Sequence, residues 1–374
     1  MTAYSLADSG VLERLNGIPA VDLAANPQPA LQGGCRAGAV VREIVRLRAG
    51  AGRLTPQEYF WYRLWDLALP AAAKCRFVGK RAQHRMHVAC NDRLWFAAAA
   101  DKLLFQSVMK GIGLPVPELR AVTQPGRIAP RGVPTITDAE AIATFLRRPE
   151  EYRLFIKPVG GKYSLSITSA DAFDPATDEA ILLGGARVPV AQLAESLACG
   201  PGYLIQRPLQ PAPALASRFG PRLWSLRALV LLRPSGPIIH RAVAKIATGD
   251  NPADNFWRAG NMLGAIELSS GVVTRTVSGT GADITVNASH PDTHAPIVGT
   301  PIPDWDQATD LVRIAAQALP GIRTQSWDVA LTDSGPVLLE VNFGGDLNLA
   351  QLAHGAGVLD ETYAEHLRQN GYRL

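Results

Sequence analysis

The stretch of sequence that decides the fold is Trp327–Asn342, which reads WDVALTDSGPVLLEVN. Two apolar runs flank the segment Asp333–Ser334–Gly335, which has the composition of a tight turn, so the stretch predicts a β-hairpin. The apolar neighbours are nearly continuous along both runs. Continuous runs of this kind are typical of strands that are covered on both faces, so we expect both strands to be buried.

Three polar side chains interrupt this apolar hairpin: Asp328, Glu340 and Asn342. Glu340 and Asn342 are two residues apart and therefore project from one face, and Asp328 can lie opposite Glu340 across the turn. Two buried carboxylates that converge are disfavoured without a cation. Their oxygen ligands suit Mg²⁺, with Mn²⁺ as an alternative ion. A hairpin whose acids face solvent is the competing interpretation.

A second informative segment begins with the strand-like run RLFIKPV at residues 153–159, which carries Lys157. A glycine-rich loop follows, made of Gly160, Gly161, Lys162, Tyr163 and Ser164. Free backbone N–H groups in such a loop, together with two lysines, can form an anion-binding concavity. An ordinary Gly-Gly turn has the same pattern.

The rest of the chain predicts an α+β fold with mostly antiparallel sheets after a helical N-terminal region. Thr55 and Glu58 form a capping box with Pro56 at the first helical position, and a single helix is expected over Asn91–Met109. Strands, hairpins and a few helices dominate after Gly113. The expected divisions are residues 1–112 (helical), 113–212 (a smaller lobe with the glycine-rich loop) and 213–374 (a larger lobe with the metal site).

Composition restricts the class of protein. The 374 residues are 47% hydrophobic and 19% charged, as in globular proteins, and 37 Lys and Arg against 33 Asp and Glu give a net charge of +4. No basic run indicates a nucleic-acid partner. No apolar stretch reaches the ~18 residues of a membrane span, and the first residues lack a signal-peptide pattern. We therefore expect a cytoplasmic protein with four reduced, mostly buried cysteines.

The order of these features resembles the ATP-grasp superfamily. It begins with Asp101–Lys102 and GLPVP at residues 113–117, continues with Lys157 before a glycine-rich loop and a strand ending at Gln206, and closes with Asp…Glu-x-Asn. The chain is most similar to the sugar-transfer-associated ATP-grasp family over roughly residues 55–365. The segments that carry this likeness are SLRALVL (225–231), DNPADNF (250–256), HPDTHAPIVGTPIPDW (290–305) and the opening hairpin.

The resemblance implies that ATP lies between two α+β lobes. Lys102 and Lys157 would then contact the phosphates, and the loop from Gly160 to Ser164 would fold over them. Gln206, Arg207 and Leu209 would line the nucleotide site near the adenine. Gln206 is a departure, because many relatives outside the subfamily carry Glu there, and PLQPAPAL (208–215) supplies no acid for the ribose.

The function implied is an ATP-dependent ligase that activates a small-molecule carboxylate as an acyl phosphate and joins it to an amine or a similar nucleophile. Arg227 and Lys245 are the candidate catalytic residues. The planar fork of Arg227 suits a substrate carboxylate. The alternatives are a small-molecule kinase on the same fold and a nucleotide-binding protein without turnover.

Overall fold

A helical region opens the part of the chain that the computed structural model describes, which comprises residues 27–124, 126–160, 167–249, 251, 253–279, 284–343 and 345–374. The capping box predicted at Thr55 is confirmed: its N–H donates to Glu58 at 2.8 Å, and its hydroxyl accepts from the N–H of Glu58 at 3.3 Å. The helices are α2 (Gln28–Gln32), α3 (Ala37–Ala49), α4 (Pro56–Trp61), α5 (Ala71–Lys74), α6 (Lys80–Cys90), α7 (Ala97–Ala100) and α8 (Lys102–Gly111).

The single helix expected over Asn91–Met109 is wrong, because a 3₁₀ turn, α7 and α8 replace it. The side-chain Oδ1 of Asn91 accepts from the N–H of Thr324 at 2.8 Å, far along the chain. Asp101 begins α8 by accepting from the N–H of Leu104 at 2.9 Å. Asn and Asp side chains favour such bonds to backbone over helix interiors, so they divide the helical stretch.

The smaller of two antiparallel sheets has six strands in the order β1-β6-β2-β3-β4-β5. Two helices, α9 (Ala139–Leu146) and α10 (Val190–Ala198), share a buried apolar cluster with it. Its strands are β1 (Leu119–Val122), β2 (Leu154–Pro158), β3 (Thr168–Asp174), β4 (Glu179–Leu182), β5 (Arg187–Pro189) and β6 (Tyr203–Gln206). The strands predicted around β2 and β6 are confirmed, whereas β3 to β5 carry too little apolar alternation to be predicted.

The larger sheet has seven antiparallel strands in the order β11-β10-β9-β8-β7-β12-β13. It contains the hairpins β7/β8, β9/β10 and β12/β13, and the last of these confirms the hairpin predicted over Trp327–Asn342. The strands are β7 (Trp224–Arg233), β8 (Gly236–Ile246), β9 (Met262–Ile266), β10 (Val273–Ser278), β11 (Thr285–Asn287), β12 (Thr324–Thr332) and β13 (Gly335–Asn342). The accompanying helices are α11 (Pro213–Phe219), α12 (Trp305–Gln317), α13 (Leu347–His354) and α14 (Glu361–Gln369).

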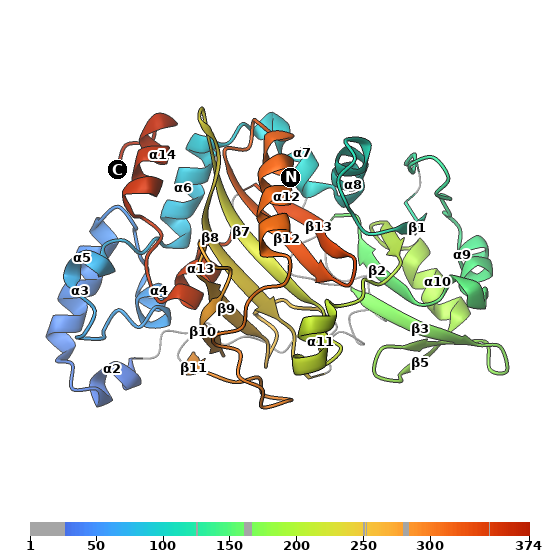
Figure 1. Ribbon diagram of the computed structural model, residues 1–374, viewed down its shortest axis with the longest axis horizontal. Coiled ribbons are helices and arrows are strands. Elements are labelled where there is room, and N and C mark those ends of the chain that lie inside the picture. The colour runs from blue at the N-terminus through green and yellow to red at the C-terminus, as the bar shows by residue number, and fades with distance from the viewer. Residues whose placement is uncertain are drawn as a thin grey trace.

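The two faces of the larger sheet are covered by different parts of the chain. Alternate residues of β7 such as Leu226 and Val230 pack with α12, whereas Leu229 and Leu231 pack with α6, α13 and α14. The helices α3 and α4 reach this second face farther along, at Val243 and its neighbours. In Figure 1 the helices α2 to α5 lie at one end of the molecule and the smaller sheet at the other, with the larger sheet between them, whereas α7 and α8 lie on the side of the smaller sheet.

The two sheets are joined by the segment 207–212 and by α8. The N–H of Ala212 donates to Leu331 at 3.0 Å, which fixes the segment to β12. The N–H of Lys102 donates to the carbonyl of Val159 at 3.0 Å, directly after β2. The second bond holds the start of α8 against the end of β2, and the ion pair of Lys102 with Glu340 brings α8 to the edge of the larger sheet.

Two predictions made from composition can be compared with the structure. No helix in the described ranges combines the length and hydrophobicity that a membrane span requires. All four cysteines are free thiols, but the expectation that most are buried is wrong: Cys90 is buried, Cys35 is partly buried, and Cys75 and Cys199 are exposed. The two exposed thiols lie at helix ends, where the chain turns back to solvent.

Candidate functional site

The predicted carboxylate pair forms in the β12/β13 hairpin. Asp328 and Glu340 are direct register partners, and a bulge follows them, since Val329 pairs with Leu338. Every residue of β12 is buried, but β13 is the edge strand of the sheet and is only partly buried. The expectation of two buried strands is therefore wrong for β13, because an edge strand has a neighbour on one side only. This leaves Glu340 accessible while Asp328 is enclosed.

Arg227 of β7 holds Asp328 from the opposite side. The two residues are register partners, and Arg227 donates from Nε to Oδ1 at 2.8 Å and from Nη2 to Oδ2 at 2.5 Å. Burial raises the pKa of the Asp328 carboxyl, but the charges of Arg227 and Lys245 outweigh it and hold that pKa well below its usual range. The fork of Arg227, predicted to face a substrate carboxylate, is thus engaged with a carboxylate of the protein.

Lys245 of β8 lies beside this ion pair. Its Nζ is 3.6 Å from Asp328 and 3.0 Å from Asp254, and the hydroxyl of Ser225 also donates to Asp254. Burial lowers the pKa of Lys245, but Asp254 and Asp328 outweigh it and raise that pKa. Sequence reasoning missed Asp254 and Ser225. The strand alternation that puts Ser225 and Arg227 on one face was the signal that could have found Ser225.

Two lysines approach the carboxylates from the other side of the site. Lys102, the first residue of α8, places its Nζ 3.7 Å from Glu340. Lys157, near the end of β2, is buried, and burial lowers its pKa to about 8, against the attraction of Glu340 and Asp328 and with a further lowering by Lys102. The structure therefore brings together Lys102, Lys157, Arg227, Lys245, Asp328 and Glu340, all of which the sequence singled out.

The glycine-rich loop follows Lys157. Gly160 is described, and a Cβ added to it would meet nothing within 4 Å. Gly161, Lys162, Tyr163 and Ser164 lie outside the described residues, so their expected place over the phosphates stays a prediction.

The predicted nucleotide-binding strand, β6, lies between β1 and β2 near one edge of the smaller sheet. Gln206, at its end, pairs with Leu119 of β1 and Phe155 of β2. It is 1% exposed, and its Nε2 finds no hydrogen-bond acceptor among the residues that the structure covers. Arg207 forms an ion pair with Glu118 at 2.9 Å. A buried amide donor without an acceptor is costly, so the predicted contact of Gln206 with a nucleotide would satisfy this group; that contact stays a prediction.

The donor set at the hairpin can be tested against a divalent cation. Asp328 and Glu340 are paired across the ladder, Asn342 follows on the same face, and its Nδ2 finds no acceptor in the described ranges. Within those ranges no group of three His, Cys, Asp or Glu side chains gathers in the geometry of a metal site, so the candidate set rests on these two carboxylates and the amide. Two carboxylates and an amide are hard oxygen ligands, which Mg²⁺ prefers, so the residues fit this ion.

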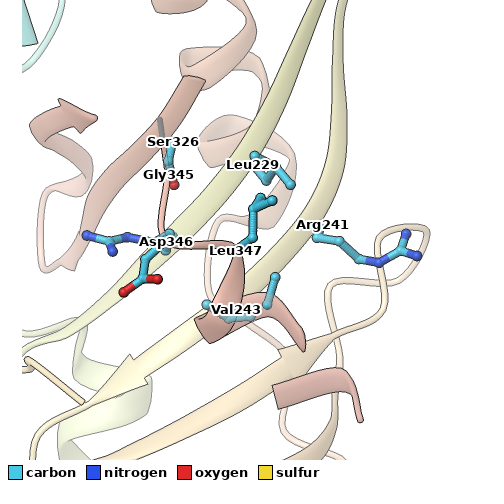
Figure 2. A pocket seen from close by; sticks show the side chains of 9 residues that line it. Leu229, Arg241, Val243, Ser326, Gly345, Asp346 and Leu347 are labelled. Carbon is cyan, nitrogen blue, oxygen red and sulfur yellow. The ribbon is translucent and has the colours of Figure 1, made fainter. Parts of the chain in front are cut away.

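A small pocket continues the site along the same face of the sheet (Figure 2). Asp346 and Leu347, at the start of α13, lie beside Leu229 and Val243 of the sheet, and Arg227 lines the pocket as well. Lys80 of α6 forms an ion pair with Asp346 at 2.5 Å. The pocket therefore adjoins the ion-pair cluster at Arg227, and the ion pair of Asp346 links its wall to α6.

Three solved structures of low sequence identity align with this chain. A PurK N5-carboxyaminoimidazole ribonucleotide synthetase in an ADP complex gives 11% identity over 73% of this chain and 53% of that chain, with a TM-score of 0.39. The ATP-grasp ligase PsnB with Mg and ADP gives 15% identity over 75% of this chain and 61% of that chain, with a TM-score of 0.37. D-alanine–D-alanine ligase from Bacillus anthracis with ATP gives 10% identity over 75% of this chain and 68% of that chain, with a TM-score of 0.39.

This chain thus spans little more than half of the first two of those proteins. No curated protein matches it in sequence. A family model described as sugar-transfer associated ATP-grasp matches residues 183–366, a range that holds Arg227, Lys245 and the β12/β13 hairpin. This match confirms the resemblance inferred from the motifs. Residues 183–366 of the chain therefore belong to the sugar-transfer associated ATP-grasp family.

Proposed function

We propose that the chain is an ATP-dependent ligase that activates a carboxylate as an acyl phosphate and joins it to an amine or a similar nucleophile. The observation that carries this proposal is the convergence of Lys102 and Lys157 on the carboxylate pair Asp328–Glu340. The lysines come from α8 and from the smaller sheet, whereas the acids come from the larger sheet. A site between two lobes that holds lysines on one side and carboxylates on the other suits a nucleoside triphosphate with its metal ion, because the lysines can bind the phosphates and the carboxylates the metal.

Lys102 and Lys157 are assigned to the phosphates. Lys157 is buried, so a phosphate oxygen beside it would meet a charge that little water screens. The loop Gly160–Ser164 directly follows β2 and is assigned to close over the phosphates. Exclusion of water at this point would protect an acyl phosphate from hydrolysis.

Asp328, Glu340 and Asn342 are assigned to Mg²⁺, which when bound supplies positive charge against the phosphate oxygens during transfer. Arg227 fixes the orientation of Asp328 through two hydrogen bonds. Lys245, buried beside them, is assigned to the negative charge that develops on the transferred phosphoryl group and the acyl oxygen.

The adenine is assigned to the end of β6. The Nε2 of Gln206 is a buried donor, and the backbone N–H of Leu209 lies farther along the same segment. Pro208 has no N–H to donate, which favours Leu209 as the backbone donor. Arg207, which forms an ion pair with Glu118, is assigned to the rim of this subsite.

The test is a screen for ADP release by the purified chain with ATP and Mg²⁺ against pooled carboxylates and amines. Hydroxylamine traps an acyl phosphate as a hydroxamate, so ADP release with hydroxamate formation supports the ligase. A stable phosphorylated product instead would establish the kinase, and ATP binding without turnover in any pool would establish the silent nucleotide-binding protein. The variant E340Q serves as the background control for contaminating ATPases.

A further inference from the structure

The proposed function leaves two sequence segments unused, DNPADNF (250–256) and HPDTHAPIVGTPIPDW (290–305). Of their described residues, Asp254 forms an ion pair with Lys245, and Asp292 accepts a hydrogen bond from Gly249, just before the first segment. The first belongs to the connection between β8 and β9, whose ends Ile246 and Met262 are register partners. Because the two strands are already adjacent there, a tight turn would be enough to connect them. The longer connection therefore calls for another explanation.

One buried side chain sets the shape of this connection. Asn261 is 1% exposed. Its Oδ1 accepts from the N–H of Thr248 at 3.1 Å and from Asn251 Nδ2 at 2.9 Å. Its Nδ2 donates to the carbonyls of Ala253 and Asn255, both at 2.8 Å. All the bonding capacity of this amide is thus spent on holding the residues on either side of Asp254.

The second segment holds the connection from outside. The N–H of Gly249 donates to Asp292 at 2.6 Å. His290 anchors the segment that carries Asp292: it is 1% exposed, and its ring lies 5.8 Å from the ring of Phe219. The two motifs therefore form one support, and the side chain that this support delivers to the site is Asp254.

Asp254 competes with Asp328 for Lys245. The Nζ of Lys245 is 3.0 Å from Asp254, which is hydrogen-bond distance, and 3.6 Å from Asp328, which is too long for a hydrogen bond. The side chains of Lys245 and Asp328 are 9% and 3% exposed, so water screens their attraction weakly. Without Asp254, Lys245 would move onto Asp328 and join Arg227 there.

We propose that Asp254 is a positioning residue that holds Lys245 back from Asp328. With Asp254 in place, Arg227 is the only cation among the described residues that hydrogen-bonds to Asp328 and would share it with a divalent ion. Lys245 then stays directed to the anionic substrate. This inference rests on the proposed metal site of the ligase. On this proposal, the two segments DNPADNF (250–256) and HPDTHAPIVGTPIPDW (290–305) serve to fix the carboxylate of Asp254 opposite Lys245.

The experiment is a titration of the purified chain with Mn²⁺ alone, followed through the electron paramagnetic resonance signal of the free ion. Binding that E340Q abolishes defines the site. D254N should raise the dissociation constant of that site at least threefold, because Lys245 then pairs with Asp328. K245M should lower the constant at least threefold, because a positive charge 3.6 Å from Asp328 is removed from the site. A merely structural role for Asp254 would not give opposite signs to the two variants.

The double variant D254N/K245M separates positioning from simple loss of charge. With Lys245 absent, Asp254 has nothing to position, so the double variant should bind Mn²⁺ about as tightly as K245M. If D254N weakens binding equally in both backgrounds, or if K245M fails to tighten it, the inference is overturned. D310N, on the exposed surface of α12, matches the change of charge and should leave the constant unchanged.

If D254N does not fold, the comparison of D254N/K245M with K245M still decides the matter, because the double variant leaves neither member of the buried ion pair without its partner. Failure of the wild-type chain to bind Mn²⁺ would overturn the metal assignment and this inference together. If the substrate screen shows ADP release but the Mn²⁺ dissociation constants of D254N and K245M change in directions other than those expected, the ligase function is kept and only the role of Asp254 is withdrawn.

Discussion

Asp328 and Glu340 lie directly opposite each other on neighbouring strands, yet their surroundings differ sharply. The side chain of Asp328 is 3% exposed, and both its oxygens accept hydrogen bonds from Arg227. The side chain of Glu340 is 30% exposed, and Lys102 is 3.7 Å from it. The difference follows from strand order, since β12 has a neighbour on each side and β13 is at the edge.

Two carboxylates of one site therefore serve the protein differently. A buried charge without a partner is expensive, so Asp328 and Arg227 stabilise each other in the folded chain as well as in any reaction. A partly exposed carboxylate keeps much of its hydration and needs no such partner. Glu340 can then bind and release a cation at little cost to the fold.

The largest effect is expected for D328N. The change leaves Arg227 and Lys245 buried without their common countercharge, and breaking a buried pair costs about 3 kcal/mol of unfolding free energy or more. Activity and the Mn²⁺ site should be lost as well. Urea unfolding measures the first quantity, with D310N on the surface of α12 as the matched control. A D328N protein as stable as the wild type would show that the pair does not support the fold.

E340Q should separate activity from stability. Turnover with Mg²⁺ should fall to background, because one of the two charged oxygen ligands is removed. The unfolding free energy should change by no more than about 0.5 kcal/mol, as for other partly exposed positions. ADP release and urea unfolding on the same preparation check both parts. Residual turnover near the wild-type level at limiting Mg²⁺ would remove Glu340 from the metal site.

The lowered pKa of Lys157 predicts that the unfolding free energy and the ATP affinity depend on pH. Burial lowers its pKa to about 8, so above that pH the unfolded chain binds more protons than the folded chain until lysine titrates in the unfolded state. The unfolding free energy of the wild type should therefore rise with pH across this window relative to K157M. ATP affinity should fall over the same window, since the cation is lost. Urea unfolding measures the unfolding free energy and calorimetry measures the ATP affinity, both from pH 7.5 upward. Lys110 is exposed, so K110M is the control for loss of a lysine. If the unfolding free energies of the wild type and K157M ran parallel with pH, this prediction would be contradicted.

The sequence was sufficient for features set by local pattern. The β12/β13 hairpin follows from two apolar runs around a turn, and the Asp328–Glu340 pairing follows from their equal distance to that turn. The capping box at Thr55 is likewise contained within four residues. Each of these depends on neighbours in the chain, which is what periodicity and spacing report.

Features that depend on contacts between distant segments were not predictable in the same way. The bond between Asn91 and Thr324 breaks a stretch that reads as one helix. The pairing of Arg227 with Asp328 requires the register of β7 against β12, which no turn sets. The place of Asp254 depends on a loop held by Asn261. The sequence shows which of these side chains are charged or polar, but it does not show which distant residues they contact.

The smallest effect is expected for K102M, which tests the comparison from the side of Glu340. Lys102 is the first residue of α8, and Met there has a similar helix propensity. Its ion pair with Glu340 is long and partly exposed, so its removal should cost at most about 0.5 kcal/mol of unfolding free energy. R227M, which strips a buried carboxylate of its partner, should cost about 3 kcal/mol or more.

Urea unfolding of K102M and R227M under one set of conditions gives both numbers, and added salt sharpens them. Screening weakens exposed pairs more than buried ones, so the small cost of K102M should shrink further at high salt while that of R227M should persist. Equal costs for the two variants would mean that β13 is as enclosed as β12 in solution. ATP affinity should nevertheless fall in K102M, because the charge assigned to the phosphates is lost whatever its part in the fold.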